Sequence, residues 1–238
     1  MSSVRRSEGT VEWFEPVSGS RFKEEDMSQR SVPDVVVRRL TQYYHALRLC
    51  QDRGVEIVSS QALGEMLNVT AAQIRKDLSY FGGFGKQGIG YNVATLLEHL
   101  RRILGMDRTW PVALVGLGNL GRALVHYQGF AKEGFQIVAL FDSDPRKIGT
   151  TLAGLTIYHD GEIGRLVPHL GVRLAMLAVP PEKAQEAADV LAQAGVRAIL
   201  NYAPATLRVP EGVWVRQMDP LAALESMTFY LSMGEEAG

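Results

Sequence analysis

The sequence predicts an α/β protein in which a small helical domain precedes a doubly wound parallel sheet. A glycine-rich turn over residues 116–121 follows an apolar strand over residues 112–115, which is how many such sheets begin. After that turn, strand-like and helix-like segments alternate regularly, as in parallel sheets. The chain before the turn instead carries short capped helices, so we expect a separate domain there.

Length and composition are those of an ordinary globular chain. Of the 238 residues, 46% are hydrophobic and 21% charged, which suits one large domain or two modest ones. The apolar runs are strand-sized and residues 1–30 have no apolar core segment, so we expect neither a membrane span nor a signal peptide. The single cysteine, Cys50, excludes an internal disulfide framework and fits a reducing cytoplasm, which is the expected location.

The charge of the chain is uneven along its length. Residues 28–108 carry eleven Lys and Arg against seven Asp and Glu, a net charge of +4, although the whole chain has a net charge of −1. Residues 109–238 carry ten against thirteen. A basic segment on a near-neutral chain favours a polyanionic partner for the first domain.

The N-terminal domain is expected over residues 31–108, after a disordered extension over residues 1–30 that has no apolar period. Its first helix begins near Pro33 and ends before Gly54, and a strand over residues 55–58 follows. Ser59 or Ser60 caps a second helix, Thr70 caps a third over residues 71–81, and Asn92 caps a fourth. The second and third helices together form a helix-turn-helix. The stripe expected to be buried on the first helix is Val36, Leu40, Tyr43, Leu47 and Cys50.

The third helix has side chains suited to a DNA major groove. Gln73, Arg75 and Lys76 lie on its accessible faces, and these residue types read guanine and adenine edges. The glycine-rich segment 82–91 predicts a winged-helix hairpin with a basic tip. By charge alone an ordinary solvated helix face fits as well, but the capped helices, basic face and basic wing together favour DNA binding. The candidate DNA-binding residues are Ser59, Ser60, Thr70, Gln73, Arg75, Lys76, Ser79, Tyr80, Lys86, Gln87 and Tyr91.

The glycine-rich turn predicts a dinucleotide-binding Rossmann domain over residues 109–219. Gly116 permits the tight turn, Gly118 lets a pyrophosphate approach the backbone, and Gly121 lets helix and strand pack closely. A helix over residues 122–130 and a strand over residues 135–142 follow the turn. Phosphates at a helix N-terminus meet free N–H groups and the favourable end of the helix dipole.

Asp142 predicts which dinucleotide binds. A carboxylate at the end of the second strand accepts hydrogen bonds from ribose hydroxyls and repels a 2′-phosphate, so NAD(H) is favoured although Arg146 and Lys147 lie close by. Further strands over residues 172–179, 196–200 and 213–215 place residues 178–180 and 201–204 at the ligand edge of the sheet.

The last helix, over residues 220–233, is apolar on more than one side. A helix on the surface of its own subunit has a single apolar stripe, so this helix is expected to pack between two surfaces, one of them from a partner chain.

Short segments in both domains carry a specific resemblance. They are residues 59–60, 74–82, 90–91, 116–121, 141–142, 147–149, 199–204 and 218–219. Together they resemble the Rex family of redox-sensing repressors. The resemblance implies a homodimer that binds inverted-repeat operators when NADH is scarce and releases them when NADH accumulates. It also implies that a C-terminal helix, here in residues 220–238, is exchanged between subunits as a domain-swapped element.

By position, the resemblance puts Tyr127 near the nicotinamide and Asp219 over the pocket of the partner subunit. His45 stands where the family usually has an arginine, and Pro220 stands where a bulkier apolar residue is commoner. The candidate cofactor-binding residues are Gly116, Leu117, Gly118, Asn119, Leu120, Gly121, Tyr127, Asp142, Val179, Pro180, Asn201, Tyr202 and Asp219.

Two other functions fit parts of the sequence. A nicotinamide-dependent dehydrogenase needs an acid or base over the nicotinamide, but no histidine lies in residues 178–180 or 201–204. A CoA-binding Rossmann domain has a similar glycine turn, but Asp142 favours a ribose diol. We therefore expect a regulator with no catalytic residue and no metal site.

Overall fold

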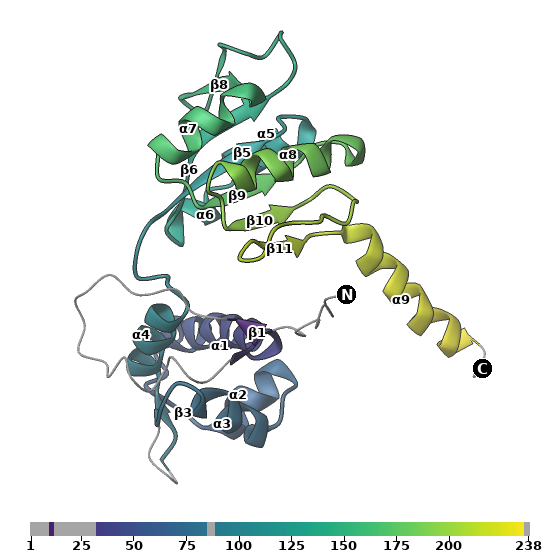
Figure 1. The fold of residues 1–238 in the computed structure, drawn as a ribbon. Helices are drawn as coiled ribbons and strands as arrows, with labels where there is room; N and C mark the ends of the chain where they lie inside the picture. Colours follow the sequence, from purple (N-terminus) through teal and green to yellow (C-terminus); the bar gives the residue numbers. More distant parts are fainter. Residues whose placement is uncertain (1–9, 12–31, 85–88, 236–238) are drawn as a thin grey trace, which may run out of the picture. The chain divides into compact units, whose positions relative to one another are not determined.

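The computed structural model describes residues 10–11, 32–84 and 89–235. It divides into two compact units, Met1–Asp107 and Arg108–Gly238, which are treated separately below (Figure 1). Most of the predicted N-terminal extension lies outside the described residues, and so do Lys86 and Gln87 at the tip of the predicted wing.

Within its described residues, the first unit contains four helices and two short strand pairs. Its strands are β1 (Thr10–Val11) with β2 (Val32–Pro33), and β3 (Ile57–Val58) with β4 (Tyr91–Asn92), both antiparallel. Its helices are α1 (Asp34–Asp52), α2 (Ser60–Leu67), α3 (Ala71–Ser79) and α4 (Val93–Ile103). The predicted stripe of α1 is confirmed, since all five of its members are buried.

Capping residues fix where α2, α3 and α4 begin. The Ser59 hydroxyl accepts a hydrogen bond from the Ala62 N–H at 3.0 Å, and the Thr70 hydroxyl accepts one from the Gln73 N–H at 3.1 Å. Asn92 caps α4 in the same way, so the predicted caps are confirmed. The tight turn between α2 and α3 requires Gly64, because a Cβ there would overlap the carbonyl oxygen of Val69.

The predicted wing differs in its pairing. Residues 82–84 form no strand, and Tyr91 pairs with Val58 of β3 instead of with the chain just before the tip. Gly90 makes this possible, since its φ of 98° is left-handed and a Cβ would overlap the Val58 carbonyl. The described part of the segment is therefore anchored on β3 rather than closed as a hairpin.

The second unit is a doubly wound sheet. Its strands lie in the order β11-β10-β9-β5-β6-β8-β7, and all pairs are parallel except β7 with β8. From β5 the chain adds strands first on one side and then on the other. The strands are β5 (Trp110–Val115), β6 (Phe135–Asp142), β7 (Thr151–Leu152), β8 (Leu155–His159), β9 (Leu174–Leu177), β10 (Ala198–Asn201) and β11 (Trp214–Gln217).

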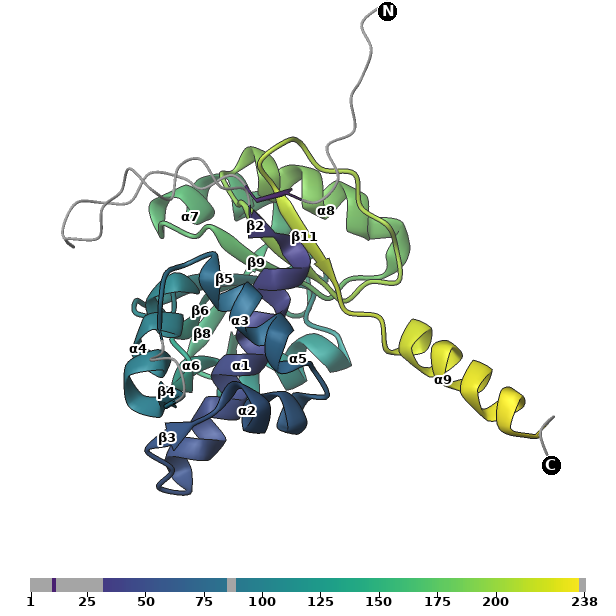
Figure 2. The ribbon, with the colours of Figure 1, turned by 90° about the horizontal axis from the view of Figure 1, so that it is seen from below.

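Helices cover both faces of this sheet. In two views, α7 (Ile163–His169) and α8 (Pro181–Gln193) cover one face, while α5 (Asn119–His126) and α6 (Gly129–Lys132) cover the other (Figures 1 and 2). Each face of the sheet packs on its own hydrophobic core. Because side chains of a strand alternate between the two faces, Ala113 and Val115 of β5 lie in one core and Val112 and Leu114 lie in the other. The last helix is α9 (Pro220–Glu235). Within the described residues, no helix has the length and apolar character needed to cross a membrane.

Two features of this unit differ from expectation. The predicted helix over residues 122–130 is split into α5 and α6 because Tyr127 is extended, with ψ of 100°, and its ring lies directly against Gly129. The β7–β8 hairpin and α7 were not predicted, since the strands of the hairpin are short and carry little periodicity.

Candidate nucleic-acid interface and dinucleotide site

The glycine turn meets the loop after β9 at the point where the strand order reverses. Strands β5 and β9 are neighbours, and the Ala178 N–H donates to the Val115 carbonyl at 2.8 Å. Gly116 has φ of 92°, and a Cβ there would overlap the Ala178 carbonyl. The two segments predicted to line the ligand edge thus lie side by side, where doubly wound sheets bind their ligands.

The other two glycines of the turn differ in their surroundings. A Cβ on Gly121 would overlap the Gly116 carbonyl, so helix α5 can approach β5 only with glycine there. A Cβ on Gly118 would meet no atom within 4 Å, and Gly118 is the N-terminal cap of α5. The backbone at Gly118 is therefore open to a ligand at a helix N-terminus, as a pyrophosphate requires.

Asp142 is buried at the tip of β6, with 7% of its surface exposed. One carboxylate oxygen accepts the Leu117 N–H at 2.8 Å and the Lys147 ammonium at 2.8 Å, while the other accepts the Asp144 N–H at 2.8 Å. Burial raises the pKa of Asp142, but Lys147 and the two backbone donors outweigh it and hold that pKa below its usual range. Lys147 thus contacts the carboxylate itself, while Arg146 pairs with Asp144.

The other predicted cofactor-binding residues differ in how exposed they are. Asn119, Leu120, Tyr127 and Pro180 are exposed, and Val179 and Tyr202 are half-buried. Tyr127 contacts Phe130 edge to face, with ring centroids 4.9 Å apart.

Asn201, another predicted cofactor-binding residue, lies inside the protein. It is fully buried, and its amide donates to the Ala205 carbonyl at 2.9 Å and to the Gln217 side chain at 2.7 Å. Its oxygen accepts the Ala203 N–H at 3.0 Å, so the side chain shapes the turn after β10 instead of facing a ligand. The sequence predicts a cofactor contact for Asn201, whereas the bonds of its side chain are all internal.

Asp219 caps the last helix, a role that the sequence analysis missed. One of its carboxylate oxygens accepts the Leu221 N–H at 3.0 Å. Every described side chain of α9 from Leu221 to Ser232 is exposed, including Phe229 at 60% and Tyr230 at 74%.

Helix α3 presents the predicted polar face to solvent. Arg75, Lys76 and Ser79 are exposed, while Ile74 and Leu78 are buried in the core of the unit. Thr70 is exposed at the start of the helix, and Gln73 and Tyr80 are half-buried. A helix with such an exposed polar face suits a major groove.

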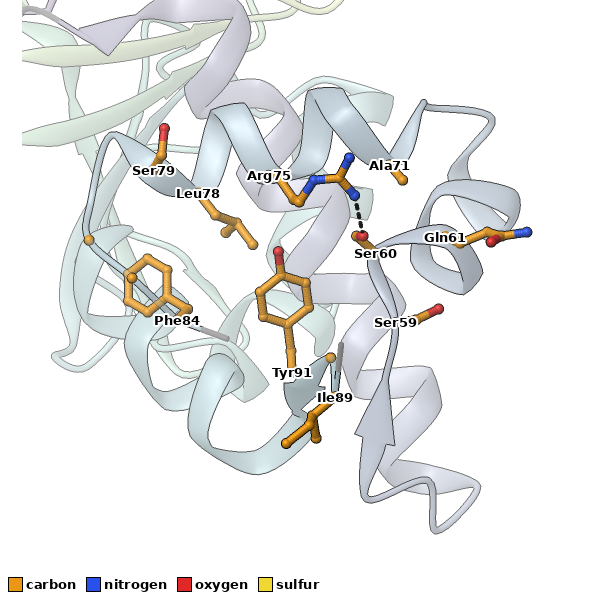
Figure 3. Close-up of a pocket in the computed structure, with 13 residues that line it drawn as sticks. Ser59, Ser60, Gln61, Ala71, Arg75, Leu78, Ser79, Phe84, Ile89 and Tyr91 are labelled. Atoms are coloured by element: carbon orange, nitrogen blue, oxygen red, sulfur yellow. Dashed lines mark hydrogen bonds between the residues drawn. The ribbon is translucent and has the colours of Figure 1, made fainter. Parts of the chain in front are cut away.

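A cavity of about 760 Å³ lies between α2, α3 and the described part of segment 82–91 (Figure 3). Arg75 and Ser60 both line this cavity, and the Arg75 guanidinium donates a hydrogen bond to the Ser60 hydroxyl at 2.9 Å. Tyr91, predicted on the DNA surface, is instead 8% exposed and packs in the core with its ring lining the cavity. Burial raises the pKa of Tyr91. The lining residues are Ser59, Ser60, Gln61, Ala71, Arg75, Leu78, Ser79, Gly82, Gly83, Phe84, Ile89, Gly90 and Tyr91.

Asp77, which is not among the predicted site residues, is fully buried on the inner side of α3. Its carboxylate accepts hydrogen bonds from Arg39, Tyr43 and Gln73. The signal was available, because Ile74 and Leu78 mark the inner face of the helix and Asp77 lies between them. A charged residue on a buried face requires hydrogen-bonding or charged partners, and α1 supplies two of them, Arg39 and Tyr43.

Proteins of known identity resemble this chain over most of its length. The redox-sensing transcriptional repressor Rex of Chloroflexus aurantiacus is 58% identical over 204 residues, which cover 86% of this chain and 96% of the relative. The protein of the same name from Streptomyces coelicolor is 42% identical and covers 87% of this chain and 81% of its own. The chain belongs to the Rex family.

Solved Rex-family structures match both units. The structure of RSP in complex with β-NAD⁺ and operator DNA has a TM-score of 0.82 at 36% identity, covering 87% of this chain and 95% of that one. The complex of RSP with β-NADH has a TM-score of 0.78 at 34% identity, covering 86% and 96%. Family models also match: a putative DNA-binding protein N-terminus over residues 31–79 and a CoA binding domain over residues 107–205.

These findings separate the functions that the sequence left open. Rex proteins are transcriptional regulators, so the dehydrogenase interpretation is wrong and the regulator interpretation is confirmed. The match over residues 107–205 carries the name of CoA, but the two RSP complexes described above contain β-NAD⁺ and β-NADH. The cofactor of this family is therefore the one that Asp142 predicts.

Proposed function

We propose that this chain is a homodimeric, cytoplasmic repressor that binds inverted-repeat operators when NADH is low and leaves them when NADH binds. The likeness to RSP, found both with operator DNA and with NADH, is the observation that carries the proposal. The separation into residues 31–108 for DNA, 109–219 for NAD(H) and 220–238 for dimerisation belongs to the same proposal.

On the DNA side, α3 enters the major groove and its outward residues divide the work. Lys76 and Ser79 face base edges because they are exposed, and the half-buried Gln73 joins them. Arg75 is held by Ser60 beside the N-terminus of α2, a position that suits a backbone phosphate better than a base. Ser59, Thr70 and Tyr80 add backbone contacts, and Lys86 and Gln87 form the tip of the wing.

On the cofactor side, the pyrophosphate lies over Gly118 and the adenosine ribose meets Asp142. Leu117, Asn119 and Leu120 complete the cradle, while Tyr127, Val179, Pro180 and Tyr202 surround the nicotinamide. NAD⁺ carries one more positive charge on this ring than NADH, and an apolar surrounding penalises the cation. NADH therefore binds more tightly, and a dimer closed around it misplaces the two α3 helices relative to the operator.

Gly118 gives the sharpest test of this function. Its φ of −70° tolerates any L-residue and its Cβ would point into open space, so Gly118→Val should fold normally. The valine would occupy the pyrophosphate position and abolish NADH binding. We expect the variant to bind operator DNA as the wild type does but to ignore NADH, measured by fluorescence anisotropy of a labelled operator. A variant that still leaves the operator at the wild-type NADH concentration would overturn the proposed site.

The last helix makes the dimer in this proposal, as a domain-swapped element. Its exposed apolar side chains include Leu221, Leu224 and Phe229, and together they would form an aggregation-prone surface in a monomer. An isologous dimer covers them and matches a palindromic operator. Deleting residues 220–238 should give a monomer or an aggregate without NADH response, measured by light scattering and operator shift. A truncated chain that remains a soluble, NADH-responsive dimer would contradict this role.

A further inference from the structure

Helix α3 is tied to α1 through the buried Asp77 carboxylate. One carboxylate oxygen, Oδ2, accepts from Arg39 Nε and from the Tyr43 hydroxyl, each at 2.6 Å. The other, Oδ1, accepts from Arg39 Nη2 at 2.8 Å and from Gln73 Nε2 at 2.7 Å. Gln73, a half-buried residue one turn before Asp77, is thus the member of this network nearest the start of α3.

The carboxylate fixes which way round the Gln73 amide lies. Burial raises the pKa of Asp77, but the bonds from Arg39, Tyr43 and Gln73 outweigh it and keep that pKa below its usual range. An ionised carboxylate only accepts hydrogen bonds, so the Gln73 group that faces it must be the NH₂ and not the oxygen. This contact uses one N–H of the amide and does not use the amide oxygen or the second N–H.

The local sequence offers Gln73 a different partner, which it does not use. Thr70 and Gln73 have the spacing of a capping box, in which the glutamine side chain bonds back to the cap residue. The Gln73 backbone N–H does bond to Thr70, but its side-chain amide goes to Asp77. The side chain is therefore held by the network between α1 and α3 rather than by the helix end.

We propose that Asp77 is a positioning residue for base recognition: it holds Gln73 so that one amide oxygen and one N–H face the operator. An acceptor beside a donor is the pair that the major-groove edge of adenine takes through N6 and N7. Gln73 then selects an A·T pair in each half-site. A side chain already ordered in the free protein loses less conformational freedom on binding. The inference rests on the proposed entry of α3 into the major groove.

The test measures selectivity base pair by base pair. Operators with each base pair of the half-site substituted in turn are titrated with full-length protein. Gln73→Ala identifies the base pair that Gln73 reads, by a loss of discrimination of about tenfold at that pair. Asp77→Asn keeps the shape of the side chain but removes its charge, and we expect a similar loss at the same base pair. In the Gln73→Ala background, Asp77→Asn should cause no additional loss there.

Tyr43→Phe is the matched control. It removes one bond of the same network, but on Oδ2, and leaves the contact of Oδ1 with Gln73 in place. It should lower the melting temperature without changing the base selectivity. A purely structural role for Asp77 predicts instead that Asp77→Asn and Tyr43→Phe weaken all operators alike, and that result would overturn the proposal.

The remaining outcomes separate this inference from the proposed function. If Gln73→Ala and Lys76→Ala both leave operator binding unchanged, the placement of α3 is wrong and the inference fails with it. If Gln73→Ala relaxes selectivity at one pair and Asp77→Asn does not, only the inference is overturned. Should Asp77→Asn not fold, NMR of the wild-type Gln73 side-chain amide decides. One slowly exchanging N–H in free and bound protein supports the inference, and two rapidly exchanging protons overturn it.

Discussion

Asp77 of the first unit and Asp142 of the second are both buried acids, but their partners differ. Asp77 is 0% exposed and receives all its hydrogen bonds from side chains. Two of these side chains, Arg39 and Tyr43, lie on α1. Asp142 is 7% exposed and receives two bonds from backbone N–H groups and one from Lys147. A carboxylate has about four acceptor positions, so Asp77 is saturated whereas Asp142 keeps capacity at the ligand edge of the sheet.

The cations in the two sites sharpen the contrast. Arg39 binds Asp77 through two N–H groups of a planar fork, which fixes the relative position of α1 and α3. Lys147 makes a single contact on a flexible stem and can move when a ribose competes for the carboxylate. The first arrangement suits a fixed reading surface, and the second suits a site that a ligand enters.

The contrast predicts unequal losses of stability. Asp77→Ala leaves the Arg39 guanidinium and the Tyr43 hydroxyl without their acceptor, so we expect the free energy of unfolding to fall by about 3 kcal/mol. Asp142→Ala, the matched variant in the other unit, removes backbone contacts at a partly open edge and should cost about 1 kcal/mol. Urea denaturation of both variants measures the difference. Equal losses would show that the two carboxylates do not differ in this way.

Asp142 and Lys147 should have opposite effects on the preference for NADH over NADPH. Asp142→Asn removes the charge that repels a 2′-phosphate and leaves Lys147 beside it, so NADH should lose about tenfold in affinity relative to NADPH, or about 1.4 kcal/mol. Lys147→Met removes the cation and should sharpen the preference for NADH. Titrations of both nucleotides by calorimetry measure the ratio. If the wild type binds NADH and NADPH equally, Asp142 does not have the proposed role.

Acid should weaken the first unit through Asp77. Its pKa is lowered in the folded state, so its contribution to stability is complete above the usual aspartate pKa of about 3.9 and is lost as pH falls through the folded value. Asp77→Asn should therefore flatten the acid side of the stability profile. Urea midpoints of wild type and variant between pH 2 and 5 test this, and parallel profiles would rule it out.

The sequence predicts well what depends on neighbouring residues. The caps Ser59, Thr70 and Asn92, the glycine turn and strand β6 were all found, because each depends on contacts within a few residues or on simple periodicity. The family resemblance added the order of the two domains.

Long-range contacts explain what the sequence did not show. Asp77 meets Arg39 across 38 positions of the chain, and Asn201 meets Gln217 across 16. The pattern of α3 places Asp77 on its inner face, but nothing local identifies the partners on α1, and nothing local marks Asn201 as buried. Tyr91 was placed on the DNA surface for the same reason, since its burial depends on the pairing of β4 with β3.

His45 is exposed, unlike the buried Asp77 and Asp142, and its substitution should have the smallest effect of those predicted here. It is exposed on α1, next to the Tyr44 ring at 5.5 Å, where the family resemblance expects an arginine. We hypothesise that its cationic form pairs with Asp219 of the partner subunit in one state of the dimer. A guanidinium presents five N–H donors in a planar fork and an imidazole ring presents at most two, so His45→Arg should strengthen this pair. An exposed pair contributes about 0.5 kcal/mol, so the NADH concentration that releases the operator should differ two- to threefold between His45→Arg and wild type. Anisotropy of a labelled operator titrated with NADH measures this, and identical NADH titrations of wild type, His45→Arg and His45→Ala would exclude His45 from the switch.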